Sequence, residues 1–238
     1  MHPFIHFPVP ILHLHTAVIT TMTSLATINL LRLVSPALPI GAFAYSQGLE
    51  AAIEAGHISS RQDTEEWLEA IFQRTICQLD LPIIKRIFEA YEAEEFQEVQ
   101  YWNQFVLASR ETFELHKEER DIGNALGRLL RDLGEPNPVA GSQPGYVCQF
   151  AWAGVAWDIP LTDLVSGFAY SWFENQIAAA TKLVPLGQTD AQRTLAELCK
   201  LIPHANVDLL DHELNQSLPG LAAMSSRHEV QSARLFRS

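Results

Sequence analysis

Three potential metal ligands, His204, Asp208 and His212, follow one another at intervals of four residues late in the chain. On a helix this spacing places them along one stripe, and neutral imidazole together with carboxylate suits a borderline divalent metal. The first and third are about two turns apart, however, which is too far to close around one ion without another chain segment. The three residues are therefore weak metal candidates, and a solvated helix face is our preferred interpretation.

A second group of histidines lies in an N-terminal segment that contains no formal charge. If this segment is extended, His13 and His15 share one face and form a conceivable metal pair. The segment is also apolar enough to suggest a signal peptide, but it lacks a basic start and is interrupted by three prolines. We prefer to interpret residues 1–23 as a disordered or mis-started extension, with Met22 as the true start.

Catalytic chemistry finds little support in the sequence. There is no P-loop for phosphates, no HExxH motif for zinc and no GxSxG motif for a nucleophilic serine. Ser35, Tyr45 and Ser46 could line the active site of an α-helical enzyme, but no general base accompanies them. The pattern favours a non-catalytic protein that acts by binding others.

The composition narrows the choice of partners and compartment. Of the 238 residues, 16 are Lys or Arg and 28 are Asp or Glu, which gives a net charge of −12 at pH 7. Such a chain repels nucleic acid and anionic membranes, so we expect neither as a partner. Cys77, Cys148 and Cys199 are far apart and odd in number, which argues against disulfides and favours the cytoplasm, each thiol packing as a small apolar group.

The elements that must position these residues are arranged around residues 35–50, SPALPIGAFAYSQGLE. Two prolines keep the chain out of a helix as far as Gly41, and this glycine permits a tight turn. From about Ala42 we expect a helix that carries Phe43 towards the core and ends at Gly56. Because the stretch is too apolar for a surface loop, we expect it to pack against its neighbours.

Amphipathic patterns with helical spacing occupy most of the remaining chain. One helix is expected to begin after Ser60, and Asp80 and Pro82 are expected to start the next one in its capping and early positions. Residues 110–121 contain five acids and three bases, many of them at i and i+4. This segment predicts either an exposed helix with weak ion pairs or an interaction face.

The most apolar tract, residues 146–173, could be mistaken for a membrane span. Asp158 and Pro160 interrupt it well short of the roughly 20 apolar residues that a span requires. Two buried helices are therefore the better prediction.

The chain as a whole predicts one domain. The loop at 134–145 is rich in turn formers, but its length suits a connection within a domain. We predict an all-α single domain of roughly eight to ten helices over residues 24–238, with a docking tail at about 217–238. Arginines flank Leu235 and Phe236 in this tail, and their guanidinium groups can bind partner carboxylates in a bidentate manner.

Four segments of the sequence resemble one known family. They are SPALPIGAFAYSQGLE at 35–50, SRETFELHKEERDIGNALGRLL at 109–130, KLVPLGQTDAQR at 182–193 and SSRHEVQSARLFRS at 225–238. On these segments the chain is similar to the urease accessory protein UreF family, and four matches in order are more specific than any one. One departure is Ala42, where the family signature often has glycine, so that a positive φ at this position would weaken the match.

The resemblance implies a non-enzymatic, cytoplasmic accessory protein that helps to insert nickel into urease. In that family UreF dimerises, joins UreD (also called UreH) and the GTPase UreG, and bridges them to the urease apoprotein. It is thought to regulate GTP hydrolysis by UreG. The resemblance further implies no tightly bound cofactor, Ni²⁺ as transient cargo, and a tail that becomes ordered when the complex forms.

Polar and aromatic positions within the matching segments are the predicted partner-binding residues. They are Phe43, Tyr45, Glu50, Arg110, Glu111, Lys182, Arg227, Glu229, Arg234, Phe236 and Arg237. The rival interpretation is a nickel store that uses His13, His15, His204 and His212. Such a store should lose most of its Ni²⁺ sites on truncation before Met22, whereas a transferring scaffold need hold the ion only weakly.

Overall fold

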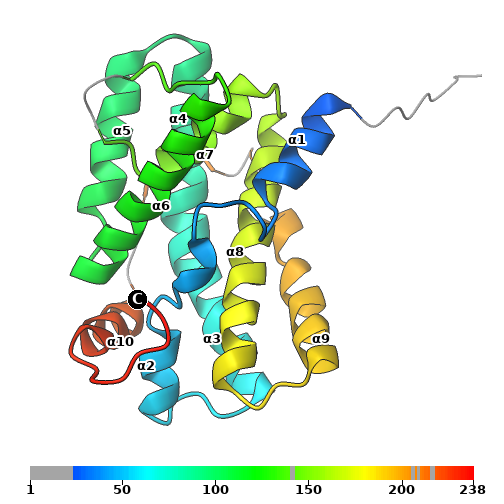
Figure 1. The fold of residues 1–238 in the computed structure, drawn as a ribbon, viewed down its shortest axis with the longest axis vertical. Coiled ribbons are helices and arrows are strands. Elements are labelled where there is room, and N and C mark those ends of the chain that lie inside the picture. Colours follow the sequence, from blue (N-terminus) through cyan, green and yellow to red (C-terminus); the bar gives the residue numbers. More distant parts are fainter. Residues whose placement is uncertain (1–23, 140–142, 205–206, 208–209, 215–217) are drawn as a thin grey trace, which may run out of the picture.

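Helices form the regular structure of this chain (Figure 1). The computed structural model describes all residues except 1–23, 140–142, 205–206, 208–209 and 215–217. Every regular element in that described part is helical, which confirms the predicted all-α class and the single helical domain. In chain order the elements are α1 (Leu25–Leu33), η1 (Ala42–Ala44), α2 (Leu49–Glu54), α3 (Arg61–Ile71), η2 (Phe72–Asp80), α4 (Leu81–Glu92), α5 (Phe96–Ala108), α6 (Phe113–Asp132), α7 (Tyr146–Ala156), α8 (Leu161–Leu183), α9 (Gln188–Cys199), η3 (Ile202–His204) and α10 (Pro219–Glu229).

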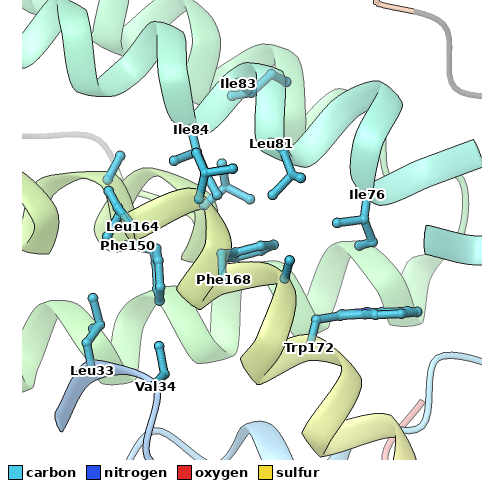
Figure 2. Packing of buried hydrophobic residues seen from close by; sticks show 14 of the residues in the cluster. Leu33, Val34, Ile76, Leu81, Ile83, Ile84, Phe150, Leu164, Phe168 and Trp172 are labelled. Carbon is cyan, nitrogen blue, oxygen red and sulfur yellow. The ribbon is translucent and has the colours of Figure 1, made fainter. Parts of the chain in front are cut away.

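Helix α4 lies at the centre of the core, where it packs against α5, α7 and α8. Its Ile83, Ile84 and Ile87 are completely buried. In Figure 2, Phe150 of α7 and Phe168 of α8 lie on the side of α4 toward which Ile84 points. Burial of each large aliphatic side chain stabilises the fold by roughly 1.5–3 kcal/mol, so this cluster holds the domain together.

The apolar tract at 146–173 forms two helices, as predicted. Helix α7 ends at Ala156 and α8 begins at Leu161, and Asp158 between them has a positive φ of 53°. Both helices contribute fully buried residues to the core. Among the described residues, none of the helices combines the length and apolarity needed to cross a membrane.

The predicted helix start at Asp80 is confirmed in position, because α4 begins at Leu81 directly after it, but the predicted capping role of Asp80 is wrong. Helix α3 continues into η2, a π-helical segment, which leads directly into α4 without a cap. Asp80 has helical backbone angles, with φ −65° and ψ −51°, and its carboxylate contacts Arg110 instead of capping a helix. Pro82 is tolerated because it lies in the first turn of α4.

The continuous helix predicted from Ala42 is also wrong. Only a 3-10 turn forms at Ala42–Ala44, after which Gln47 and Gly48 take positive φ values of 51° and 78°. A Cβ atom on Gly48 would lie 3.0 Å from the backbone nitrogen of Ser225, so this glycine lets α10 approach α2. Phe43, in the middle of the 3-10 turn, is 57% exposed and does not join the core.

The remaining details of this stretch agree with the sequence. Helix α2 ends shortly before Gly56, as expected. The positive φ lies at Gly41, with a value of 77°, and not at Ala42. Alanine in place of the family's frequent glycine is therefore compatible with this backbone.

The C-terminal region differs most from the sequence-based expectation. Its pattern showed no strong helical stripe, yet residues Pro219–Glu229 form α10. Before it, η3 is only one 3-10 turn, and the described residues 210–214 contain no helix. The stripe expected for His204 and His212 is therefore not formed by these described parts, while Asp208 lies outside them.

Gly123 provides a test of how closely α6 and α7 pack. A Cβ atom at this position would lie 2.5 Å from the backbone carbon of Gly145 and 2.7 Å from the backbone nitrogen of Tyr146. We expect Gly123→Ala to lower the free energy of unfolding by roughly 1–3 kcal/mol, because backbone atoms must shift. Urea denaturation measures this loss.

The matched control for this test is Gly220→Ala. Gly220 lies in α10 and has no heavy atom within 4 Å of an added Cβ. Alanine is the better helix former, so the control should not lose stability. Equal stability of the two variants would contradict the close packing at Gly123.

Candidate partner-binding site

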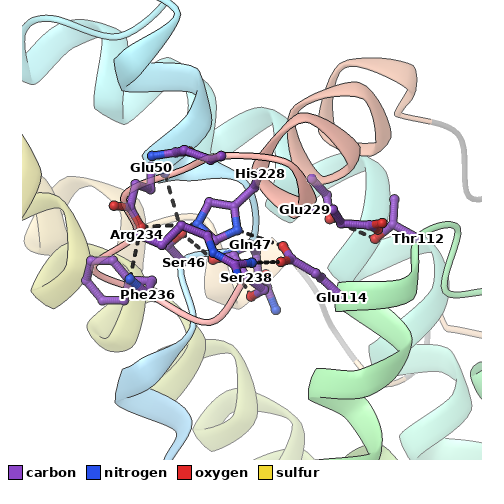
Figure 3. A network of polar contacts seen from close by, with 12 residues as sticks. Ser46, Gln47, Glu50, Thr112, Glu114, His228, Glu229, Arg234, Phe236 and Ser238 are labelled. Atoms are coloured by element: carbon purple, nitrogen blue, oxygen red, sulfur yellow. Dashed lines mark hydrogen bonds and ion pairs between the residues drawn. The ribbon is translucent and has the colours of Figure 1, made fainter.

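Polar residues from three helix ends meet where the C-terminal segment returns to the body of the protein (Figures 1 and 3). We call residues 230–238, which follow α10, the tail. Glu50 lies in the first turn of α2, Glu114 in the first turn of α6 and His228 in the last turn of α10. Carboxylates favour helix N-termini and cations favour C-termini, so each side chain suits its own helix end.

The carboxylate of Glu50 binds the tail through the main chain. Its Oε1 accepts the backbone N–H of Leu235 at 2.8 Å, and its Oε2 accepts that of Phe236 at 2.9 Å. The same Oε2 lies 3.1 Å from Nε2 of His228. Glu50 is buried, so these three donors replace the water that an exposed carboxylate would bind.

His228 joins Glu50 to Glu114. It is completely buried, and its Nδ1 lies 2.7 Å from Oε2 of Glu114. Each nitrogen of the ring therefore lies within hydrogen-bond distance of a buried carboxylate. Arg234 Nη1 donates to the other oxygen of Glu114 at 2.8 Å. We call Glu50, Glu114, His228 and Arg234 the latch, since together they hold the tail on α2 and α6 (Figure 3).

The end of the tail is bound by a second set of hydrogen bonds. The carbonyl oxygen of Ser238 accepts the backbone N–H of Ser46 at 2.9 Å and also the Ser46 hydroxyl. The Ser238 hydroxyl donates to Oε2 of Glu118 at 2.9 Å. Gln47 donates to the other oxygen of Glu118 at 2.9 Å, and its own carbonyl accepts the indole N–H of Trp172. The tail thus reaches through Gln47 to α8.

An aromatic side chain of the tail packs against α2 and the end of α8. The Phe236 ring is buried in a small apolar cluster with Leu49 and Val184. Lys182 Nζ, at the end of α8, lies 5.3 Å from the centre of this ring, in a cation–π position. Residues from the third matching segment therefore also contact the tail.

Contacts with α6 position α10 itself. The hydroxyl groups of Thr112 and Ser225 are 2.7 Å apart. The backbone N–H of Phe113 donates to Oε1 of Glu229 at 3.1 Å, so that Glu229 satisfies one free amide at the start of α6. Besides the contacts of the latch, two hydrogen bonds therefore hold α10 against the start of α6.

Arg110 lies inside the protein and not on an exposed ion-paired face. Its guanidinium contacts Asp80 and lies 2.7 Å from Oε2 of Glu119. Glu119 Oε1 accepts the backbone N–H of Val147 at 2.8 Å, which connects α6 to α7. Burial raises the pKa of Asp80, and the nearby Arg110 opposes this rise.

The surface ion pairs expected for residues 110–121 form only in part. Lys117 pairs with Asp121, as its spacing suggested. Arg110 does not pair with Glu114, because Glu114 turns inward to the latch. Glu114, Glu118 and Glu119 are all buried, so this segment has a buried acidic face as well as an exposed one.

A cavity of about 60 Å³ lies between these networks. Gln47, Asp80, Arg110 and Glu118 line it, together with the indole of Trp172. Burial raises the pKa of Glu118 to about 7, although its hydrogen bonds to Gln47 and Ser238 act in the opposite direction. The interior beside the tail is therefore polar and sensitive to protonation.

The candidate metal ligands do not form a site that the structure can describe. Across the described ranges, no three His, Cys, Asp or Glu side chains come together in a way that could hold a metal ion. The backbone carbonyl of His212 accepts from Arg86 at 3.1 Å. Asp208, His13 and His15 lie outside the described residues, so the metal candidates stay predictions.

Ser35, Tyr45 and Ser46 do not converge on a common site. The Ser35 hydroxyl accepts the backbone N–H of Ala37, and the Ser46 hydroxyl donates to Ser238. The Tyr45 hydroxyl donates to Asp121 at 3.1 Å, and burial raises the pKa of Tyr45 to about 12. Each of these side chains takes part in holding the local backbone or the tail.

Apart from the interior Arg110, the predicted partner-binding residues fall into three groups. Glu50, Tyr45 and Phe236 are buried, and the tail itself contacts or contains Glu50 and Phe236. Lys182 and Arg234 lie at the edge of the tail, where they contact Phe236 and Glu114. The exposed group consists of Phe43, Glu111, Arg227, Glu229 and Arg237.

Sequence reasoning missed His228, Glu114 and Glu118. A signal for the two glutamates was present, because they follow the helical spacing of the buried Leu115 and Ile122 and so belong to an apolar stripe. No comparable signal marks His228, whose two carboxylate partners are more than 100 positions away in the sequence.

The latch predicts a large effect of Glu50→Ala on stability. This change leaves two backbone N–H groups and one ring nitrogen of His228 without their buried partner, so the free energy of unfolding should fall by about 3 kcal/mol or more. Hydrogen exchange at the amides of Leu235 and Phe236 should accelerate in parallel. Glu54→Ala, an exposed position of the same helix, is the control and should change little. Unchanged exchange in Glu50→Ala would contradict the latch.

Glu118 predicts a specific pH dependence. Its pKa is about 7 in the folded protein against 4.5 for the unperturbed group, so the folded state binds more protons between these values. This group therefore makes stability fall as pH rises from about 4.5 to 7. Relative to the wild type, Glu118→Gln should gain roughly 1–3 kcal/mol between about pH 5 and pH 8.

Urea denaturation at several pH values measures this difference. Glu111→Gln removes the same charge from an exposed position and serves as the control. If Glu118→Gln and the wild type lose stability in parallel across the window, the assignment to Glu118 is wrong.

Comparison with known proteins gives the same family as the resemblance of the four segments. The UreF family model matches residues 58–199. A protein named urease accessory protein UreF from Teredinibacter turnerae is 49% identical over 218 residues, which cover 89% of this chain and 98% of the relative. Proteins of the same name from Marinobacter nauticus and Pseudoalteromonas translucida are 42% and 41% identical over 90% and 94% of this chain, and over 95% and 100% of their own lengths. The chain belongs to the urease accessory protein UreF family.

Proposed function

We propose that this protein works in the cytoplasm as a non-catalytic scaffold in the maturation of urease. It would dimerise, bind UreD (UreH) and the GTPase UreG, and bridge them to the urease apoprotein. In this role it would regulate GTP hydrolysis by UreG and promote the insertion of Ni²⁺. The ion is cargo in transit, and no resident cofactor is required.

The observation that carries this proposal is the meeting of all four family-like segments at the tail. Glu50 comes from the first segment, Glu114 from the second, Lys182 from the third and His228 from the fourth. The polar side chains at this site bind backbone groups of the tail or bind one another, so they stabilise the position of the tail. A surface built in this way supports binding more than turnover.

Exposed side chains next to the latch give this surface its binding character. Val230 is 83% exposed, Leu235 is 62% exposed and Phe113 at the start of α6 is 69% exposed. Arg227 and Arg237 stand beside them on an otherwise acidic chain. Apolar side chains surrounded by arginines are typical of protein interfaces.

Exchange of Leu235 for serine tests the scaffold role. The side chain is mainly exposed, so Leu235→Ser should leave the free energy of unfolding within about 0.5 kcal/mol. If a partner covers this leucine, affinity for UreD should fall roughly tenfold, because an apolar contact is lost. Co-purification and nickel-dependent urease activation, measured with all partners co-expressed, should fall together.

Leu31→Ser is the matched control, since Leu31 is a similarly exposed leucine, at 59%, on α1. It should retain the binding that Leu235→Ser loses. Full activation of urease in cells that lack this chain altogether, under scarce nickel, would refute the proposed function itself.

A further inference from the structure

The outer side of α6 carries a row of basic side chains. Lys117, Arg120, Arg128 and Arg131 are exposed and lie three, eight and three residues apart, which keeps them on one face of the helix. Asn124 fills the position between Arg120 and Arg128. Helix α6 lies at the front of the view in Figure 1. This row is notable because the whole chain has a net charge of −12.

Two arginines of this row take no part in hydrogen bonds or ion pairs with other described residues. Lys117 pairs with Asp121, and Arg120 contacts the side-chain carbonyl of Gln143. Within the described residues, Arg128 and Arg131 make no hydrogen bond or ion pair, although Asp132 follows Arg128 by four residues. Two neighbouring guanidinium groups are thus available to an external anion.

A groove of about 280 Å³ lies beside these two arginines. Its lining includes the amide side chains of Asn124, Asn137 and Gln149, which add neutral donors. No carboxylate is among the described residues that line it, although the protein has 28 acidic side chains. The groove therefore has the polarity of an anion-binding surface.

Arg128 also borders a second hollow, of about 370 Å³, which reaches the tail. Tyr45 and Arg237 lie on its far side, and Asp121, already paired with Lys117, is its carboxylate. The groove is therefore continuous with the surface that surrounds the latch. A partner that contacts the tail could extend along α6 to Arg131.

Helix stability alone does not explain the row. Arg131 lies in the last turn of α6, where a cation favours the negative end of the helix dipole. Arg120 lies in the middle of the helix, where that effect is absent, and Arg128 precedes the last turn. A long polyanion such as nucleic acid would be repelled by the net negative charge of the chain. A short acidic segment interacts mainly with charges within a Debye length of about 8 Å, and here these include the basic row.

We propose that this groove, between α6 and the start of α7, binds an acidic segment of a partner protein, with carboxylates paired to Arg128 and Arg131. The inference builds on the proposed scaffold role and gives it a second contact apart from the tail. Its partner is defined by chemistry, as an exposed stretch rich in Asp or Glu.

A direct test uses the full chain and a fluorescent octaglutamate peptide. Binding measured by fluorescence anisotropy should weaken with added salt, because the contacts are ionic. Arg128→Glu with Arg131→Glu should weaken it by about tenfold or more. The charge-matched control, Arg74→Glu with Arg193→Glu, changes two exposed arginines on η2 and α9 and should bind nearly as the wild type does.

Several outcomes would overturn the proposal. The first is that the variant with Arg128→Glu and Arg131→Glu binds octaglutamate as tightly as the wild type. The second is that the control variant weakens binding as much as this variant does. The third is that the wild type binds a thymidine oligonucleotide of the same charge more tightly than octaglutamate. Arg128→Gln with Arg131→Gln, checked by circular dichroism, repeats the test should the reversal fail to fold. This assay needs no urease, so failure of the wild-type chain to support urease activation would count against the scaffold role and not against the groove.

Within the accessory system, the reversal at 128 and 131 should reduce co-purification with one partner and lower urease activation. The control reversal should retain both. Purified partner should also displace octaglutamate from the wild-type chain. A partner complex that forms unchanged with the reversal variant would overturn the groove as a contact.

Discussion

A buried carboxylate needs hydrogen-bond donors, and Glu50 obtains its donors from the far end of the chain. Two backbone amides of the tail and one ring nitrogen of His228 surround it. Without them the charge would be buried and unsatisfied, which is one of the most destabilising conditions in a protein. The position of the tail, the closeness of α10 to α2 and the shape of the surrounding surface all depend on this requirement.

Helix α6 connects this requirement to the core and to the outside. Its inner face holds Glu114 and Glu118 against the tail and Glu119 against Arg110 and α7. Its outer face carries the unpaired Arg128 and Arg131. The same helix therefore contacts the tail on its inner face and solvent on its outer face.

The fold class could be predicted from the sequence more accurately than the contacts of the buried polar residues. Helical periodicity was sufficient for the all-α class and for the break near Asp158, because apolar spacing reports burial directly. Helical periodicity did not predict the contacts of buried polar residues whose partners are distant in the sequence. Asp80 looked like a helix cap because a cap is the common local use of aspartate before a proline, whereas its actual partner is Arg110 on another element.

The site was predictable in outline and not in detail. Family resemblance identified the four segments, including Glu50 and Phe236, but residue types alone could not separate those that hold the tail from those that face solvent. His228 was missed because its role depends on three helix ends meeting in space. Phe43 was misplaced because the expected α-helix does not form around it, and only a 3-10 turn forms at Ala42–Ala44.

The π-helical segment η2 has a consequence for the tolerance of this protein to deletions. Its wider turns set the rotation at which α4 leaves the segment, and α4 has almost no solvent-exposed side. Loss of a single residue between Phe72 and Asp80 would change the rotation of α4 about the helix axis relative to α3. Ile83 and Ile84 would then leave their neighbours on α7 and α8, and Asp80 would leave Arg110. Length in this segment is therefore as strictly constrained as residue type.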